Sequence, residues 1–457
     1  LIPMLTAYQI EWNKLHDRLS GTDMLQRIEA HVSGERALAP DDVGDVAMAL
    51  GISADDFVKL QAAWGPALWP NLLQAGRERK DMALRLLAGS LTDYRRATDG
   101  WWNTISKAVH RSLPGDLFDR PVYFVSSNTH SFVNLLGGYA RAREQELAAY
   151  LEAENPENLW HHYQGIKNSR RQDNLENLLY YTLARYLRHG DEAEQAARQA
   201  DMQQHWGENG LLQVENPLYL DVAAQVIEFK SLCPSAFDSR LQMDGLDALR
   251  ESDAVIFNVD YPLGMAAYQI LSQAATNLGE LQGVYLMGKA ATLNGQVGDV
   301  MIPNVVYDEH SQNTYLFRNC FVAADVAPYL TQASVFDNQK AVTVRGTFLQ
   351  NRDFVSVFYK EGYTDIEMET GPYLSAVYED IYPVRYPVNE IVNLFINAPY
   401  DIGVIHYASD TPYSRRQTLL SKSLSYFGVD ATYAASIAIL RRIFAQEIAH
   451  VRKQRGA

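Results

Sequence analysis

The feature that most constrains the fold is an alternation of short apolar runs and helical segments that begins near residue 253. The runs that predict strands are 254–259, 284–287, 300–307, 341–345 and 403–408, and a helix is expected from Leu263 to Leu278. Buried strands that alternate with helices are typical of an α/β sheet with helices on both of its faces. The sequence therefore predicts an α/β fold for the C-terminal half of the chain.

Two other regions are expected to be helical. In residues 1–113, apolar residues recur at helical spacing, and Thr22 can cap one of these helices. The turn signal Pro114-Gly115 follows, and after it an apolar run through Val125 predicts a first strand. Residues 141–230 are rich in Glu, Ala, Leu, Arg and Gln. We therefore predict a helical N-terminal region over 1–113 and an α/β domain over 114–457, with a helical insertion at about 141–230.

The N-terminal region contains a segment that resembles the turn of a helix-turn-helix motif, at residues 47–53. DNA binding would require basic residues nearby, yet the flanking charges are Asp41, Asp42, Asp45, Asp55 and Asp56. The net charge of the chain is −15, which also argues against a broad contact with nucleic-acid phosphates. A helical packing unit is the better interpretation, and we expect no nucleic-acid partner.

Composition indicates the setting in which the chain works. The hydrophobic content of 47% is ordinary for a soluble globular protein. The only cysteines are Cys233 and Cys320, too few for a disulfide framework, so a reducing environment is the default. No apolar run is long enough to span a bilayer, and no secretion signal is recognisable at the start. We expect a cytoplasmic protein without a membrane partner.

Three segments carry the residues that suggest chemistry. In 287–303 a strand stops at Gly288, a loop of small residues follows, and Val-Gly-Asp-Val leads into the next strand. In 366–371 two glutamates flank a methionine between a strand residue and a helix. In 408–412 the carboxylate of Asp410 stands at the end of a strand. Each pattern is weak alone, so their order along one α/β pattern carries the information.

In that order, the three segments resemble the nucleoside phosphorylase and nucleosidase superfamily. It includes purine nucleoside phosphorylases, methylthioadenosine/adenosylhomocysteine nucleosidases and AMP nucleosidase. The resemblance covers about 253–450, with 120–140 as the first strand of the same sheet. It implies a three-layer αβα sandwich around a central mixed sheet of the phosphorylase type. It also implies a homo-oligomer that cleaves the N-glycosidic bond of a purine nucleoside or nucleotide, in nucleoside metabolism or nucleotide salvage, through an oxocarbenium-like transition state.

The resemblance implies roles for individual residues. Glu369 would accept hydrogen bonds from the ribose hydroxyls, since a carboxylate offers two acceptor oxygens and no donor. Met368 would pack on the sugar, and Glu367 would support the site. Asp410 would protonate the purine at N7 as a general acid. Of the remaining positions, Phe348 would stack on the base, Gly288 would belong to the ribose and base site, and Gly264 would lie near the nucleophile.

The nucleophile stays open between phosphate and water. The loop 126–131 holds Ser127, Asn128 and Thr129 at the start of a helix, and hydroxyl and N–H groups there suit an anion. His130 could serve as a base for water instead. A simple helix cap is the third interpretation of this loop. The reaction is therefore phosphorolysis, with inorganic phosphate as co-substrate, or hydrolysis.

Departures from the family pattern leave further alternatives. Lys289 is unexpected, and it either faces an anion, such as phosphate or a substrate 5′-phosphate, or belongs to a structural salt bridge. The segment 260–264 lacks the usual Ser-Gly-x-Gly, and the run 378–400 is longer than expected. A nucleoside-binding or nucleotide-binding regulatory protein that has lost catalysis is therefore the alternative function. No metal or organic cofactor is expected, because the adjacent histidines 161 and 162 diverge on a helix.

Overall fold

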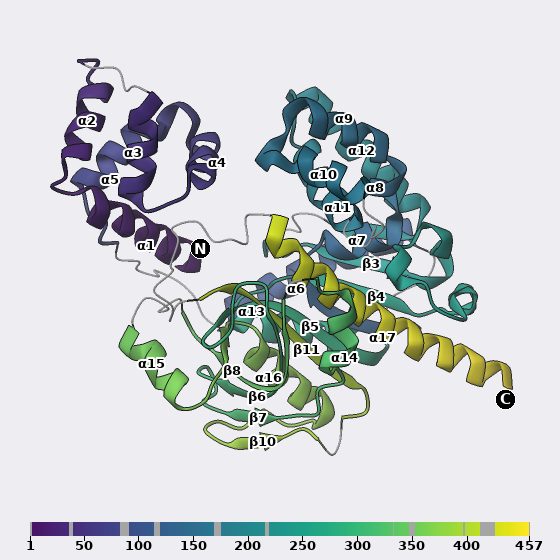
Figure 1. Cartoon of the computed structure of the whole chain (residues 1–457). Helices are drawn as coiled ribbons and strands as arrows, with labels where there is room; N and C mark the ends of the chain where they lie inside the picture. The colour runs from purple at the N-terminus through teal and green to yellow at the C-terminus, as the bar shows by residue number, and fades with distance from the viewer. Residues whose placement is uncertain are drawn as a thin grey trace.

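The computed structural model describes residues 2–35, 40–82, 91–113, 119–168, 175–214, 219–331, 333–346, 352–395, 398–411 and 426–456. Figure 1 shows a small helical lobe at the N-terminus and a larger body built around a sheet. The small lobe consists of α1 (Ile2–Leu19), α2 (Asp23–Val32), α3 (Pro40–Leu50), α4 (Ala54–Trp64) and α5 (Leu68–Arg77). Thr22 caps α2 as predicted, because its hydroxyl accepts from the Leu25 N–H at 3.4 Å.

The small lobe has a hydrophobic core of its own. Trp12, Leu19, Ile28, Phe57 and Leu72 are buried together, in a cluster separate from the clusters on the sheet. Helices that share apolar faces bury them against one another, which is the main source of helix stability in proteins. The lobe is thus a helical unit with its own apolar core.

Helix α6 (Leu91–Ser112) belongs to the larger body, although the sequence placed it in the N-terminal region. Its Trp101 and Trp102 are buried against Phe257 of the sheet, with ring centroids 6.4 and 5.6 Å from that of Phe257. The Trp101 indole donates to the carbonyl of Val222 at 2.7 Å. The predicted boundary at residue 113 therefore lies too late, because the tryptophan pair ties α6 to the sheet.

The described residues contain a mixed 11-stranded sheet. Its strands follow the order β10-β7-β6-β8-β9-β5-β1-β4-β3-β2, and β11 pairs with both β5 and β6. Their bounds are β1 (Pro121–Ser127), β2 (Leu211–Val214), β3 (Ala224–Glu228), β4 (Val255–Asp260), β5 (Glu280–Thr292), β6 (Val300–Asp308), β7 (Thr314–Leu316), β8 (Val335–Thr343), β9 (Asp365–Glu367), β10 (Ile391–Asn393) and β11 (Asp401–Asp410). The predicted α/β class is confirmed. The pairings also close a ring of β5, β11, β6, β8 and β9, which brings distant segments together.

Helices cover both faces of the sheet, which confirms the predicted three layers. Successive residues of β1 point to opposite faces, as the period of a strand requires. Tyr123 packs in the cluster of α17 (Val429–Gly456), whereas Phe124 packs in that of α6, α13 (Met265–Asn277) and α16 (Thr370–Ile381). Figure 1 shows α17, in yellow, crossing one side of the sheet.

The helical insertion ends earlier than predicted. It contains α8 (Tyr139–Ala142), α9 (Glu144–Glu154), α10 (Leu159–Asn168), α11 (Leu175–Tyr186) and α12 (Glu192–Glu208), after α7 (Ser131–Gly137). Residues 211–214 and 224–228 are strands β2 and β3 rather than helix, and β3 pairs antiparallel with β4. The buried edge of β4 is the reason, because its N–H and C=O groups need partners there. Two short helices complete the fold, α14 (Ala323–Val326) and α15 (Arg352–Lys360). No helix in the described ranges has the length and apolar content for a membrane span.

Candidate active site

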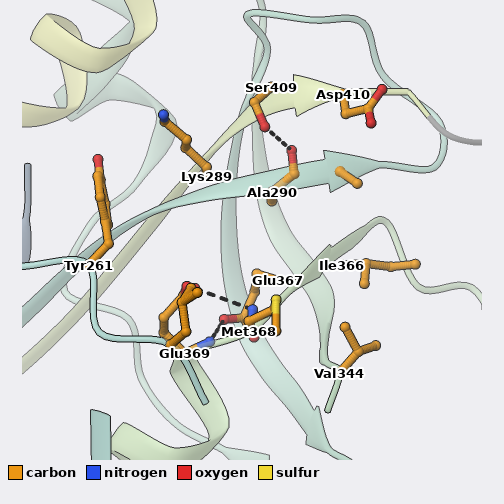
Figure 2. Close-up of a pocket in the computed structure, with 12 residues that line it drawn as sticks. Tyr261, Lys289, Ala290, Val344, Ile366, Glu367, Met368, Glu369, Ser409 and Asp410 are labelled. Atoms are coloured by element: carbon orange, nitrogen blue, oxygen red, sulfur yellow. Dashed lines mark hydrogen bonds between the residues drawn. The ribbon is translucent and has the colours of Figure 1, made fainter. Parts of the chain in front are cut away.

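A cavity of about 270 Å³ lies where β5, β9 and β11 end (Figure 2). All three segments singled out in the sequence contribute side chains to its wall. The lining residues are Tyr261, Leu263, Lys289, Ala290, Ala291, Val344, Ile366, Glu367, Met368, Glu369, Ser409 and Asp410. Its size lies near the lower end of the range for small-molecule pockets. The ring of strands therefore joins residues that are far apart in the chain into one site.

Glu367 fixes the segment that enters the cavity. One of its carboxylate oxygens accepts from the N–H groups of Glu369 at 2.6 Å and Thr370 at 2.7 Å. The other accepts from the hydroxyl of Thr343 on β8. Thr343 in turn accepts from the N–H of Gly371 at 2.8 Å. The buried Glu367 thus satisfies the free N–H groups at the start of α16, as an anion at a helix N-terminus does.

Glu369 holds a proton more tightly than an ordinary glutamate. Its carboxyl lines the cavity but is surrounded by protein, and this burial raises its pKa to about 8, with the nearby Glu367 charge as the second cause. One of its oxygens accepts from the Met368 N–H at 3.2 Å. A Cβ on Gly288 would stand 3.9 Å from the same oxygen, so this glycine leaves the carboxyl room. Near neutral pH Glu369 is therefore largely protonated.

The buried His406 and the carboxyl of Glu369 both approach Gly288. The Nδ1 atom of His406 on β11 is 2.6 Å from a carboxylate oxygen of Asp365 on β9. Its Nε2 atom is 2.9 Å from the hydroxyl of Thr370, the first residue of α16. Burial lowers the pKa of His406, but the Asp365 charge and hydrogen bond outweigh it and raise the pKa overall. His406 was not predicted from the sequence, because it stands in an apolar strand that otherwise resembles plain core.

Lys289 lines the cavity on the wall across from Glu369, with an exposed side chain (Figure 2). In the described part of the chain, its ammonium has neither a hydrogen-bond acceptor nor a carboxylate within ion-pair distance. The salt-bridge alternative for this residue therefore finds no support in the described ranges. Burial raises the pKa of Asp260, although the Lys289 charge opposes the shift. Lys289 offers an unneutralised positive charge to whatever enters the cavity.

The positive charge of Lys289 acts on the ring of His130. His130 is an exposed residue, yet the protein around the ring lowers its pKa to about 4, and the positive charges of Lys289 and Arg188 add to the effect. The ring is therefore neutral near pH 7. A neutral imidazole can accept a proton, although a pKa of about 4 makes it a weak base.

The loop before α7 directs its side chains inward. The Ser127 hydroxyl donates to the Asn258 side chain at 2.8 Å, within the sheet. The amide oxygen of Asn128 accepts from the N–H groups of His130 at 3.1 Å and Ser131 at 2.7 Å. The carbonyl of Thr129 accepts from Gln225 at 2.5 Å. This geometry agrees with the helix-cap alternative for the loop. The positively charged side chain that lines the cavity near this loop is Lys289.

The end of β11 is held by the Val-Gly-Asp-Val turn. The N–H of Gly298 donates to the carbonyl of Ala408, and the N–H of Ala408 donates to the carbonyl of Asp299, each at 2.8 Å. Asp410 follows, exposed and lining the cavity, and its carboxylate accepts from the Thr411 N–H at 2.7 Å. The turn that supports the resemblance therefore has a structural role, which is to place the strand that carries Asp410.

Gly264 is tied to the same segment as Glu369. Its N–H donates to the carbonyl of Met368 at 2.9 Å, and its φ of 58° with ψ of −133° is a conformation that favours glycine. Phe348, the residue expected to stack on the base, lies outside the described residues. Tyr261 lines the cavity instead, and its hydroxyl is 3.0 Å from that of Tyr407. The described residues contain no cluster of three or more potential metal ligands.

The fold and the cavity define a class, an α/β protein with a small-molecule pocket built from carboxylates, one lysine and apolar side chains. Within it, the chain belongs to a family of unknown function (DUF6909), whose sequence model matches residues 1–445. No curated protein matches the chain in sequence.

Several solved structures are similar to part of the chain. One is the 5′-methylthioadenosine/S-adenosylhomocysteine nucleosidase of S. pneumoniae, with a TM-score of 0.32 and 13% identity, over 54% of this chain and 94% of that one. Another is the S-adenosylhomocysteine nucleosidase of Streptococcus pyogenes, with a TM-score of 0.33 and 12% identity, over 51% and 87%. A third is the uridine phosphorylase of Schistosoma mansoni, with a TM-score of 0.31 and 11% identity, over 41% and 70%.

Proposed function

We propose that this protein cleaves the N-glycosidic bond of a purine nucleoside or nucleotide. The observation that carries the proposal is the meeting of Glu369, Lys289 and Asp410 in one cavity, although they come from separate segments of the sequence. These segments are the ones that resemble the nucleoside phosphorylase and nucleosidase superfamily. A sugar ligand, an acid and a cation around one small cavity are the groups that such a cleavage needs.

Glu369 is assigned to the ribose. As a carboxylate it accepts hydrogen bonds from two vicinal hydroxyls, and its negative charge favours the positive charge that develops on the sugar as the bond stretches. The raised pKa means that binding of the hydroxyls must displace a proton from Glu369 near neutral pH. Met368 lines the cavity beside it and is assigned to apolar contact with the sugar.

Asp410 is assigned to the base. A carboxylic acid that gives its proton to N7 of the purine makes the base a better leaving group, and such general acid catalysis typically contributes about 10²–10⁴-fold to the rate. Its exposed carboxyl lines the cavity, where it can contact a bound base.

Both nucleophiles remain candidates. Phosphate would find an unneutralised cation in Lys289, since the described residues give its ammonium no partner. Water would depend on the neutral His130 as its base, and a pKa of about 4 makes this base weak. The charge of Lys289 equally suits the 5′-phosphate of a nucleotide substrate.

The proposal is tested by incubating the full-length protein with a panel of purine nucleosides and 5′-nucleotides, with and without inorganic phosphate, and identifying products by mass. Free base is the expected product. Ribose 1-phosphate would identify phosphorolysis, and ribose or ribose 5-phosphate would identify hydrolysis. Absence of free base across the panel would contradict the proposal. If a nucleoside nevertheless raised the melting temperature, the non-catalytic binding protein would be the better account.

A further inference from the structure

We propose that His406, held between Asp365 and Thr370 and close to the same glycine as Glu369, is a positioning residue that places a positive charge beside Glu369. The relevance of this charge to the reaction rests on the proposed function, in which Glu369 binds the ribose. The inference itself concerns an arrangement of buried groups that exists without any ligand.

Both ring nitrogens of His406 have a partner. Nδ1 is 2.6 Å from Asp365, whose carboxylate can only accept, so Nδ1 carries a hydrogen. Nε2 is 2.9 Å from the Thr370 hydroxyl, which can accept or donate. All three side chains are buried, with 0, 1 and 2% of the surface of Asp365, His406 and Thr370 exposed. Water therefore does not compete for these bonds, and the ring cannot turn without losing both.

The surroundings favour the charged form of this ring. Asp365 and Glu367 face it from β9, and Glu369 faces it from the start of α16. The charges of Asp365 and Glu367, and that of Glu369 once it has ionised, raise the pKa of His406 above its ordinary value, although burial alone would lower it. In the imidazolium form, Nε2–H donates to Thr370 and Nδ1–H donates to Asp365, so every ring hydrogen is used. The nearby phenols of Tyr373 and Tyr407 have raised pKa values and are neutral in this range.

The charge of His406 acts on Glu369 in turn. Glu367 raises the pKa of Glu369, and His406 lowers it. A Cβ at Gly288 would stand 3.4 Å from Cδ2 of His406 and 3.9 Å from Oε2 of Glu369, so the two side chains approach the same glycine. Thr370 connects the two residues structurally, because it hydrogen-bonds to His406 and directly follows Glu369 in the chain. Loss of the imidazolium would leave the carboxylates uncompensated and keep Glu369 protonated to higher pH.

The test is a carboxyl ¹³C NMR titration of the full-length protein labelled at the glutamate side-chain carboxyls. The Glu369 signal is assigned by its absence from Glu369→Gln. In the wild type, its midpoint is expected near 8. In His406→Gln, which keeps hydrogen-bonding groups but removes the charge, the midpoint should rise by about one pH unit or more. His205→Gln, a change at a distant histidine that bonds a backbone carbonyl, is the matched control and should leave the midpoint unchanged.

An unchanged midpoint in folded His406→Gln would overturn the inference. If that variant does not fold, a ¹⁵N titration of the wild-type histidine rings decides: a His406 pKa above its ordinary 6.5 is expected, and a pKa at or below 6.5 would overturn the inference. Neither measurement depends on turnover. A protein that releases no base but shows the shifted midpoint would refute the proposed function and leave the role of His406 intact.

Discussion

At the scale of single residues, the cavity is defined by where its protons and charges lie. Glu369 is protonated near neutral pH because burial and Glu367 both disfavour its anion. His130, near the facing wall, is neutral because burial and Lys289 disfavour its cation. The site therefore places a proton where the proposed mechanism needs a carboxylate, and ligand binding must be coupled to proton release.

The raised pKa of Glu369 predicts a dependence of stability on pH. A carboxyl group whose pKa is higher in the folded state stabilises the fold below its unfolded value of about 4.5, and this contribution is lost as the pH rises towards 8. Over that window the free energy of unfolding should fall by at most about 1.4 kcal/mol per pH unit from this group. In Glu369→Gln this component should vanish, so the variant gains on the wild type as the pH rises. Chemical denaturation at pH 5, 6.5 and 8 measures it, and parallel curves would contradict the assignment.

Lys289 provides a second residue-scale prediction. In Lys289→Gln, the pKa of His130 should rise from about 4, because one of the positive charges that lowers it is gone. It should stay below 6.5, since burial is the larger cause. Proton NMR of the histidine rings follows this titration. Lys107→Gln, an exposed lysine on α6, is the control, and a His130 pKa that is the same in both variants would show that Lys289 does not reach the ring.

Which site residues the sequence could predict depended on their setting. Glu369, Lys289 and Asp410 stand at strand ends, where a charged side chain is conspicuous, and the cavity contains all of them. His406 was missed, since it lies within an apolar strand and its partner Asp365 is 41 residues away in the chain. Pairing of β5 with both β9 and β11 creates this contact, and no local pattern encodes it.

At the scale of elements, Gly264 links the start of α13 to the Met368 segment. Its backbone conformation is strained for any residue with a side chain, which typically costs about 1–3 kcal/mol. Space is not the obstacle, because the nearest atom to an added Cβ is Nε2 of His310 at 3.4 Å. Gly264→Ala should therefore lower the free energy of unfolding by about 1–3 kcal/mol.

Gly165→Ala is the matched control for this prediction. Gly165 lies on the exposed surface of α10 with no heavy atom near its missing Cβ, so alanine there should stabilise by about 0.4–1 kcal/mol. Urea denaturation measures both changes. An unchanged or higher free energy of unfolding in Gly264→Ala would show that the linkage to Met368 does not depend on this backbone geometry.

The elements that the sequence predicted are those with strong local signals. β4, β6 and β11 are long apolar strands, and the helix over 263–278 has clear boundaries at its ends. β9, with three residues, was predicted only as a single strand residue at Ile366, and the pair β2 and β3 was not predicted, because short strands form only where a neighbouring edge needs partners. Within the described residues, the ring of strands closes only through β9. The sequence therefore predicts which segments carry site residues, but not that these segments meet in one cavity.

At the scale of the whole molecule, the helical lobe and the sheet body have separate cores. A chain that begins at residue 83 should therefore keep the cooperative unfolding of the α/β body and lose only the helical signal of α1–α5. Circular dichroism and thermal denaturation check this. Collapse of the shortened chain into an unfolded or aggregated state would contradict the separation of the cores.

The two parts are nevertheless close enough to interact electrostatically. Burial raises the pKa of Glu11 on α1, and the charge of Asp410 adds to this shift. In Asp410→Asn the pKa of Glu11 should therefore fall towards its ordinary value, an effect that carboxyl NMR can follow. An unchanged Glu11 titration would show that the charge of Asp410 does not act on the helical lobe.

In the proposed function, Glu369 holds the sugar of a nucleoside that the protein cleaves, with Asp410 as the acid. The most direct measurement is the rate of base release by the wild type, Glu369→Ala and Asp410→Asn, beside the exposed control variants Glu152→Ala and Asp247→Asn. We predict a loss of about 10²-fold or more in both site variants and wild-type rates in both controls. Site variants that release base as fast as the controls would contradict the account.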